Sequence, residues 1–284
     1  MARRRDPPIA VLIYGAGKVG RSLARALRAH GVKTKLLAAR SGLPRKIVAD
    51  VVVMAVRDRD LGPLAQMMAA KRVVSQGAVV VHVAGALDAS PLAPLRGVCA
   101  GVAQMHPMIA FASTRFAPGL ARGNVHVQGD WVAVTRARRI ARLLGMTPRT
   151  IPHLDTIAYH AAAGLVANGA AALAAVGVEL LTRAGVLPQI APRMLGPLMR
   201  SVADNVEALG LPRALTGPVR RGEAATVTKH LATLREKLPE AVDLYLALVQ
   251  AQIPPARAIG EAPAAAFEAI ARLAERASRQ LFAR

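Results

Sequence analysis

The stretch IAVLIYGAGKVG, residues 9–20, decides the fold of this chain. An apolar run typical of a buried strand ends at the first glycine of a G-x-G-x-x-G pattern. In this pattern Gly15 permits a tight turn from strand to helix, Gly17 lets a ligand approach the backbone, and Gly20 lets the helix pack against the strand. The helix N-terminus that follows favours a phosphate. We therefore predict a dinucleotide site, with a tight turn that holds no ligand as the alternative, at Gly15, Ala16, Gly17, Lys18, Val19 and Gly20.

The end of the next predicted strand indicates which dinucleotide fits. Proteins that bind NAD usually carry Asp or Glu about 20 residues after the glycines, where it binds the ribose 2′-hydroxyl. Here KTKLLAARS, residues 33–41, ends in Arg40 and Ser41 with no acid in reach. A guanidinium can bind the 2′-phosphate of NADP, which a carboxylate would repel. We expect NADP(H), with Arg40 and Ser41 at its phosphate; in the alternative, Arg40 is one more solvated arginine.

The composition is that of a globular protein with a strongly basic balance. The 284 residues are 53% hydrophobic and 19% charged, which excludes a disordered chain and leaves room for two domains. The net charge of +21 raises nucleic-acid binding as an alternative. However, one Trp, three Tyr and four Phe offer few stacking partners for bases, and no nucleic-acid-binding motif is visible. We expect the charge to attract a small anionic cofactor and substrate.

Cysteine usage and apolar segments limit the other function classes. Cys99 is the only cysteine, so an internal disulfide and a cysteine-based metal cluster are excluded, and we expect no metal site. The basic N-terminus is not followed by an apolar signal segment. Residues 157–181 approach membrane length, but His160, Asn168 and Glu179 interrupt them, which favours a helix buried between subunits or domains. We expect a cytoplasmic protein that does not enter the membrane.

The pattern of elements changes near residue 152. Before it, apolar runs without polar alternation are typical of a parallel sheet covered on both faces, at residues 9–14, 33–38, 51–56, 79–84, 101–104 and 125–128. A helix over 131–144, with Asp130 as its cap, and a short strand near Thr150 complete this half. After it, only helices are predicted, at residues 153–184, 188–209, 222–237, 239–251 and 263–282. The predicted fold class is α/β, with a doubly wound, parallel Rossmann domain at residues 1–152 and an all-helical domain at residues 153–284.

Candidate site residues follow the carboxyl ends of the predicted strands, the edge at which this fold class binds ligands. Val56, in VMAVRD, either contacts the cofactor or belongs to the core. Gly85, in VVHVAGA, is placed to let the backbone approach the nicotinamide, and His82 before it is either a core residue or a substrate-binding residue. His106 lies in QMHPM, where the proline favours a loop. This makes His106 the better catalytic candidate of the two histidines.

The first long helix of the second half carries a polar stripe. His160, Gly164 and Asn168 recur at i, i+4 and i+8 and so share one side of the helix. A reductase needs a donor for the proton that accompanies hydride transfer. We predict His160 as that acid and Asn168 as a residue that orients substrate; hydrogen bonds to neighbouring helix ends are the alternative. Arg220 and Arg221, in TGPVRRGE, either bind a substrate carboxylate or are solvated.

Six motifs, taken in order, resemble the bacterial Rossmann-like family whose helical half is catalogued as domain of unknown function 2520. They are GAGKVG, AVRD, the H-x-x-G at residues 82–85, HPM, YHAAAGLVAN at residues 159–168 and LTGPVRRGE at residues 215–223. That family is similar to the 6-phosphogluconate dehydrogenase-like superfamily, which includes pyrroline-5-carboxylate reductase, ketopantoate reductase and coenzyme F420-dependent NADP reductases. The resemblance implies an NADP-linked reductase of a small carboxylate-bearing keto acid or imine, ketopantoate being one candidate, with a helical domain that forms a homodimer.

One departure from the superfamily pattern leaves two functions open. Hydroxyacid dehydrogenases of the superfamily carry Lys four residues before an Asn, whereas here Gly164 stands four residues before Asn168. Either His160 supplies the proton, or the chain binds a dinucleotide as a regulatory or scaffold protein without hydride chemistry. Ala84 also replaces a serine that is frequent before the glycine in this family. The substrate and the choice between NADP, F420 and FAD stay open.

Overall fold

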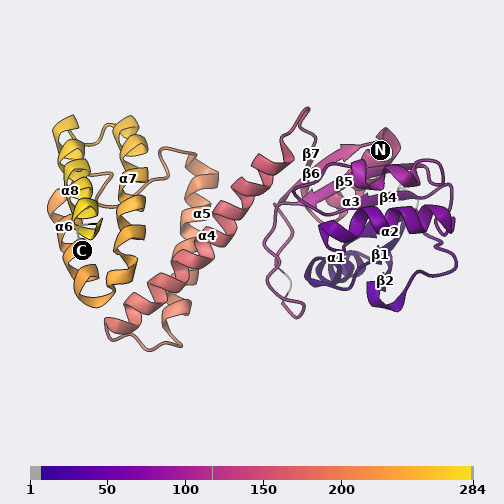
Figure 1. Ribbon diagram of the computed structural model, residues 1–284, viewed down its shortest axis with the longest axis horizontal. Coiled ribbons are helices and arrows are strands. Elements are labelled where there is room, and N and C mark those ends of the chain that lie inside the picture. Colours follow the sequence, from indigo (N-terminus) through magenta and orange to yellow (C-terminus); the bar gives the residue numbers. More distant parts are fainter. Residues whose placement is uncertain (1–7, 117, 283–284) are drawn as a thin grey trace, which may run out of the picture. The chain divides into compact units, whose positions relative to one another are not determined.

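The computed structural model describes residues 8–116 and 118–282, and these form two compact units. The first unit ends at Ala167 and the second begins at Asn168. Helix α4 (Thr156–Arg183) runs from the first unit into the second (Figure 1). The two compact units therefore divide inside this helix, and the domain bounds 1–152 and 153–284 stay a prediction. The hydroxyl of Thr156 donates to the carbonyl oxygen of Ala86 at 3.1 Å and ties the start of α4 to the first unit.

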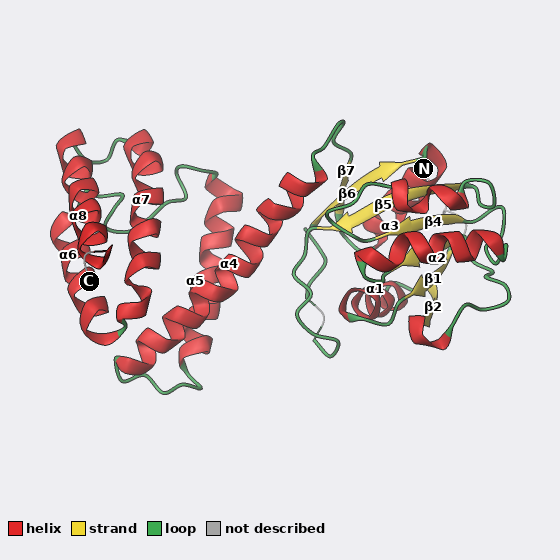
Figure 2. Cartoon of the chain, in the orientation of Figure 1, coloured by secondary structure: helices red, strands yellow, loops and turns green. Residues whose placement is uncertain are grey.

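Within the described residues, the first unit contains a seven-stranded sheet in the order β2-β1-β3-β4-β5-β6-β7 (Figure 2). Its strands are β1 (Ala10–Tyr14), β2 (Lys33–Leu37), β3 (Val51–Met54), β4 (Val79–His82), β5 (Gly101–Pro107), β6 (Asn124–Gly129) and β7 (Thr147–Arg149). Neighbouring strands are parallel except β5 and β6, which run antiparallel. The doubly wound α/β class is confirmed, and among the described strands the departure from a fully parallel sheet is the pair β6 and β7, which runs opposite to the other five.

Helices cover both faces of this sheet, which explains why its strands are apolar throughout. They are α1 (Lys18–Ala29), α2 (Asp58–Ala70) and α3 (Trp131–Leu143), with the short 3-10 helices η1 (Ala39–Ser41) and η2 (Ser90–Leu95). Leu27 of α1 and Ile140 of α3 pack on one face, and Leu61 of α2 and Leu92 of η2 pack on the other. Burying each such side chain contributes about 1.5–3 kcal/mol, so the strand ends are held firmly.

Asp130 precedes α3, as predicted, but its carboxylate does not cap the helix. It accepts hydrogen bonds from Nε of Arg96 at 3.1 Å and from the backbone N–H of Val102 at 2.9 Å. Asp130 therefore ties α3 to β5 and to the segment that follows η2.

The second unit is helical throughout its described residues. It consists of the rest of α4 with α5 (Ala191–Leu209), α6 (Ala224–Lys237), η3 (Pro239–Ala241), α7 (Val242–Ile259) and α8 (Ala264–Phe282). Val227, Leu246 and Phe267 join α6, α7 and α8 in one core. α7 continues through Pro254 and Pro255 to Ile259, whereas the helix predicted here ends at residue 251. The tendency of proline to end a helix is overridden here, because Ile253 and Ala256, on either side of the proline pair, are buried in that core.

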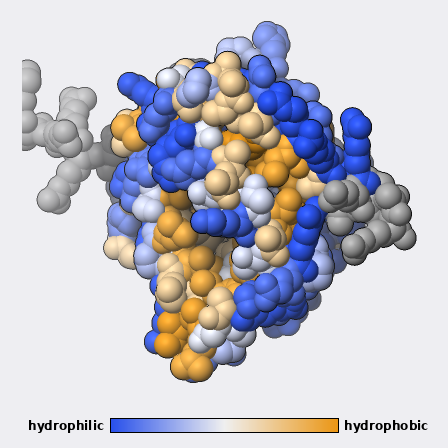
Figure 3. Space-filling view, turned by 90° about the vertical axis from the view of Figure 1, so that its left-hand side faces the viewer, coloured by the Kyte–Doolittle hydropathy of each residue, from blue (hydrophilic) through white to orange (hydrophobic). Residues whose placement is uncertain are grey.

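α4 and α5 expose much of their apolar surface in the single chain. No described residue of α4 is buried, and Leu165 and Val166 are 78% and 72% exposed. On α5, Leu198 is 58% exposed. Figure 3 shows hydrophobic residues reaching the surface between hydrophilic ones on the face that it draws. Among the described residues, α4 alone has the length and composition of a membrane span, a test that core helices of soluble proteins also pass.

Candidate functional site

The glycine-rich turn lies between β1 and β3. The strand order continues to β2 on one side of this point and to β4 on the other. Doubly wound folds bind ligands where the strand order reverses in this way. Gly15 has a φ of +117°, and a Cβ there would collide with the carbonyl oxygen of Ala55. A Cβ at Gly20 would collide with the carbonyl oxygen of Gly15. Nothing lies within 4 Å of a Cβ built at Gly17, so this residue borders open space. The three glycines thus have the geometry that a diphosphate-binding turn requires.

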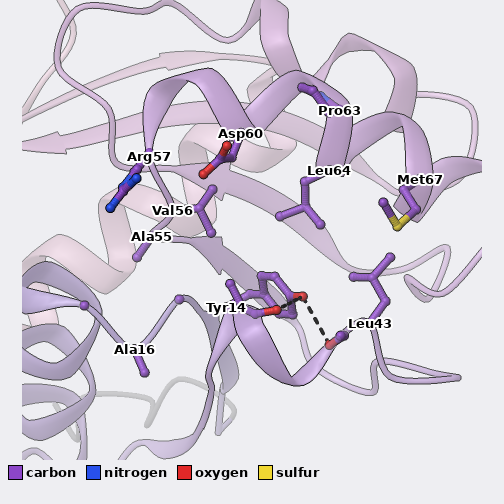
Figure 4. A pocket seen from close by; sticks show the side chains of 14 residues that line it. Tyr14, Ala16, Leu43, Ala55, Val56, Arg57, Asp60, Pro63, Leu64 and Met67 are labelled. Carbon is purple, nitrogen blue, oxygen red and sulfur yellow. Dashed lines mark hydrogen bonds between the residues drawn. The ribbon is translucent and has the colours of Figure 1, made fainter.

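A cavity of about 520 Å³ opens at this turn, within the size range of small-molecule sites (Figure 4). Figure 4 shows Val56, Leu64 and Met67 on the side of the cavity opposite Tyr14 and Leu43. This gives the cavity apolar walls next to the glycine-rich turn. Its full lining is Tyr14, Gly15, Ala16, Gly17, Ala39, Gly42, Leu43, Ala55, Val56, Arg57, Asp60, Pro63, Leu64 and Met67.

Tyr14, a residue that sequence reasoning did not single out, supports one wall of this cavity. Its side chain is 2% exposed, and burial raises the pKa of its hydroxyl. The hydroxyl lies 3.2 Å from the carbonyl oxygen of Ala39 and 3.1 Å from that of Gly42, so it can donate to either. Tyr14 thereby fixes the loop that carries Arg40.

A smaller cavity of about 230 Å³ shares Ala16 and Ala39 with the 520 Å³ cavity. Arg21, Arg40 and three alanines line it, and none of these five residues is acidic. Arg40 therefore lines the same cavity as Ala16 of the glycine turn, and its contact with a 2′-phosphate stays a prediction. Ser41 follows Arg40 in η1 but does not line this cavity.

A third cavity, of about 320 Å³, contains two of the predicted catalytic residues. It is lined by Val19, Ala55, Val56, Asp58, Val83, Ala84, Gly85, His106, Pro107, Ile109, Phe111 and His160. Ala55 and Val56 also line the 520 Å³ cavity, so the two are neighbours. A Cβ built on Gly85 would lie 2.7 Å from Nε2 of His106 and closer still to Nδ1 of His160. The absent side chain of Gly85 leaves a space on which two imidazole nitrogens converge.

The surroundings of His106 keep its imidazole neutral. Burial, followed by the neighbouring His160, His126 and His82, lowers the pKa of His106 to about 4. Its Nδ1 is buried and has no hydrogen-bond partner among the described residues. Because a buried N–H without an acceptor is costly, the single ring proton is assigned to Nε2, the nitrogen that faces Gly85. His106 therefore offers an N–H donor to the pocket.

His82 is a core residue, and its predicted contact with substrate is corrected accordingly. It has no exposed surface. Its Nε2 lies 2.6 Å from the carbonyl oxygen of Asp88, and its Nδ1 accepts the N–H of Ala84 at 3.2 Å. These two bonds satisfy both ring nitrogens, and His82 positions the backbone that leads into Gly85.

Two further side chains surround His106 and were missed by sequence reasoning. His126, 2% exposed, pairs with His106 across β5 and β6. Tyr159 of α4 packs its ring 5.5 Å from that of His106 and 5.7 Å from that of His126. Nothing in the spacing of either residue could have indicated this, because they meet only after β6 turns back against β5. Although four histidines gather here, no three metal-binding side chains in the described part of the chain are arranged to hold an ion.

The remaining predicted residues lie in the second unit. Asn168 is exposed on α4. Arg220 pairs with Glu261, and Arg221 pairs with Glu223, its Nη2 lying 3.1 Å from a carboxylate oxygen. Both guanidinium groups are therefore engaged by carboxylates of their own unit, and contact of these three residues with substrate stays a prediction.

Comparison with protein families identifies both halves of the chain. Residues 43–107 match the model of a Rossmann-like domain, and residues 124–252 match that of a domain of unknown function, DUF2520. These matches confirm the family resemblance that the motifs indicated. A search of curated proteins gives no match.

Solved structures with low sequence identity share the fold. A Bacteroides fragilis protein described as an NADP oxidoreductase is 20% identical with a TM-score of 0.67, over 86% of this chain and 98% of its own. A Thermotoga maritima protein is 24% identical with a TM-score of 0.61, over 88% and 99%. A pyrroline carboxylate reductase of Plasmodium falciparum, solved with NADP bound, is 13% identical with a TM-score of 0.57, over 86% and 98%.

Proposed function

We propose that this chain, in which a Rossmann-like domain is joined to a DUF2520 domain, is an NADP(H)-dependent oxidoreductase that reduces a small carboxylate-bearing keto acid or imine. The observation that carries the proposal is the convergence of His106 and His160 on the space over Gly85, beside a cavity bordered by a glycine-rich turn. The activities named for two structural neighbours, NADP oxidoreductase and pyrroline carboxylate reductase, support it.

Each chemical group of NADP(H) has a matching place in these cavities. The open backbone at Gly17, at the N-terminus of α1, suits the diphosphate. The slot between Leu43 and Leu64 suits the adenine, and Arg40 suits the 2′-phosphate. Val56 borders both larger cavities and leads toward Gly85, where the nicotinamide would lie. When bound there, the cofactor supplies the hydride.

The two histidines have different chemical roles in this proposal. Reduction of a carbonyl or imine adds one hydride and one proton, and the oxygen or nitrogen gains charge as the hydride arrives. His106, kept neutral, donates its Nε2–H as a hydrogen bond to that atom. His160 supplies the proton and, being exposed, recovers one from water. Ile109 and Phe111 cover part of the same pocket with apolar surface.

We also propose a cytoplasmic homodimer that covers the apolar surface of α4 and α5. Leu165, Val166 and Leu198 are each more than half exposed in the single chain, and large exposed apolar side chains that gather on a surface mark interaction sites. Replacing Leu165 and Val166 together by Ser should shift the protein toward monomer in analytical ultracentrifugation. A monomeric parent protein would contradict the dimer.

A non-catalytic dinucleotide-binding protein is the second candidate. The observation that favours it is Gly164, which stands where hydroxyacid dehydrogenases of the superfamily carry a lysine. NADPH oxidation measured across a panel of keto acids and cyclic imines separates the two functions. An oxidoreductase consumes NADPH with at least one member, whereas a binding protein titrates with NADPH and consumes none. Failure to bind NADPH or NADH at all would contradict both.

A further inference from the structure

We propose that Arg21 is the second half of the 2′-phosphate site, so that two guanidinium groups, those of Arg21 and Arg40, select NADP(H) over NAD(H). We further infer that Arg21 holds the glycine turn in place. The inference rests on the proposed function, because it assigns the 230 Å³ cavity to the extra phosphate of that cofactor.

Arg21 is anchored by one nitrogen and free at the others. Its Nε donates to the carbonyl oxygen of Ala16, the middle residue of the turn, at 2.8 Å. This bond aims the guanidinium along the edge of the turn and uses one of the five N–H donors of arginine. In the described part of the chain, its two terminal nitrogens have no protein acceptor, which leaves four N–H groups beside the cavity.

Arg40 lines the cavity from a different element. It belongs to η1, and the hydroxyl of Tyr14 can donate to the carbonyl oxygen of Ala39 or to that of Gly42, which lie on either side of Arg40 in the sequence. The backbone that presents Arg40 is therefore fixed, although its side chain is exposed. The small side chains of Ala38 and Ala39 leave the space between the two arginines open. At about 230 Å³ this space exceeds the volume of several waters, which is enough for a phosphate group.

The charge balance explains why two arginines discriminate better than one. A phosphate monoester carries a charge of about −1.5 to −2 at pH 7, so one guanidinium neutralises only part of it. With a ribose hydroxyl in place of the phosphate, Arg21 and Arg40 would face each other without an anion, and none of the residues lining the cavity is acidic to compensate. NADH is therefore expected to bind more weakly than NADPH.

Calorimetric titration of the full chain with NADPH and with NADH tests this assignment. The parent protein should prefer NADPH, and Arg21→Ala should weaken NADPH binding by about 10- to 100-fold, the effect expected for losing a charged hydrogen-bonding partner. NADH binding should weaken by a clearly smaller factor, because NADH loses only the support of the turn. Arg142→Ala, which removes one exposed arginine on α3, is the matched charge control and should change neither affinity.

Each other outcome has a defined meaning. If Arg21→Ala weakens both nucleotides by the same factor, Arg21 only supports the turn, and the two-arginine site is refuted. An unchanged NADPH affinity refutes both of its roles. If Arg21→Ala does not fold, Arg21→Lys decides, because the loss of the planar fork should still lower the ratio of NADPH to NADH affinity. A parent protein that binds the two nucleotides equally refutes the site alone, whereas one that binds neither refutes the proposed function.

Discussion

Replacing Gly85 by alanine is the most direct test of the histidine pocket. The added Cβ would lie 2.7 Å from Nε2 and 2.9 Å from Cε1 of His106, and it would press on Nδ1 of His160. Carbon atoms in contact are normally about 3.5–4.0 Å from their neighbours, so each ring must move by roughly 1 Å. The methyl group would also fill the space where the reacting atom is proposed to lie.

The size of the effect follows from that displacement. Misplacing catalytic groups by about 1 Å can reduce the rate about 100-fold, which corresponds to about 2.7 kcal/mol of transition-state stabilisation. We therefore expect kcat/KM of Gly85→Ala to fall at least that far with any substrate that the panel identifies. Affinity for NADPH should fall by a smaller factor, because only the nicotinamide end is proposed to lie at Gly85, whereas the diphosphate and the adenine are proposed to bind in the cavity beside the glycine turn.

The assay is NADPH consumption under substrate saturation and at low substrate, with NADPH affinity measured separately by calorimetry. Gly62→Ala is the matched control, since it adds the same methyl group in α2, where nothing lies within 4 Å of the new Cβ. It should keep full activity. Wild-type kcat/KM in Gly85→Ala would refute the convergence of the two histidines on the reacting atom.

Three further predictions follow from the same geometry. Because the pKa of His106 is about 4 in the folded protein against an ordinary 6.5, the unfolded chain binds more protons between these values, and stability should fall as pH drops from about 6.5 to 4. His106→Gln should remove up to about 3 kcal/mol of this dependence, measured by urea unfolding at several pH values; equal slopes in the two proteins would contradict it. His160→Ala should reduce kcat while leaving NADPH affinity nearly intact, and unchanged turnover would remove His160 from the mechanism. Tyr14→Phe, which frees the loop carrying Arg40, should cost about 1 kcal/mol of stability in thermal unfolding and weaken NADPH more than NADH; an unchanged affinity ratio would show that the loop needs no such anchor.

The structural features that short-range sequence patterns control could be predicted from the sequence. The turn at Gly15 and the apolar strands follow from local spacing, and both lie where the patterns placed them. Features that depend on tertiary packing were missed. The helix predicted to end at residue 251 continues through Pro254 because burial of neighbouring residues outweighs the local preference.

The residues of the candidate site show the same difference between what local patterns predict and what depends on tertiary packing. Gly85 was predicted because it follows a strand at the ligand-binding edge, and it lies after β4. His106 was predicted in a loop after a strand, and this placement was wrong, because β5 continues to Pro107 and His106 pairs with His126 of β6. His82 follows the same rule but points into the core, and one-dimensional periodicity cannot distinguish these cases in a strand buried on both faces. His126 and Arg21 had no distinguishing pattern at all. Only the pairing of β6 with β5, and the path of the turn past Ala16, make them part of the site.

The replacement of lysine by Gly164 and the histidine pair are connected in the proposed mechanism. A lysine at that position would combine two functions, since its ammonium group both attracts the developing charge and holds a proton. Here the two functions fall to different residues. Burial keeps His106 neutral, so it stabilises charge by hydrogen bonding alone, while the exposed His160 exchanges protons with water. This division needs both rings close to one reacting atom, and the missing side chain at Gly85 provides the space for it.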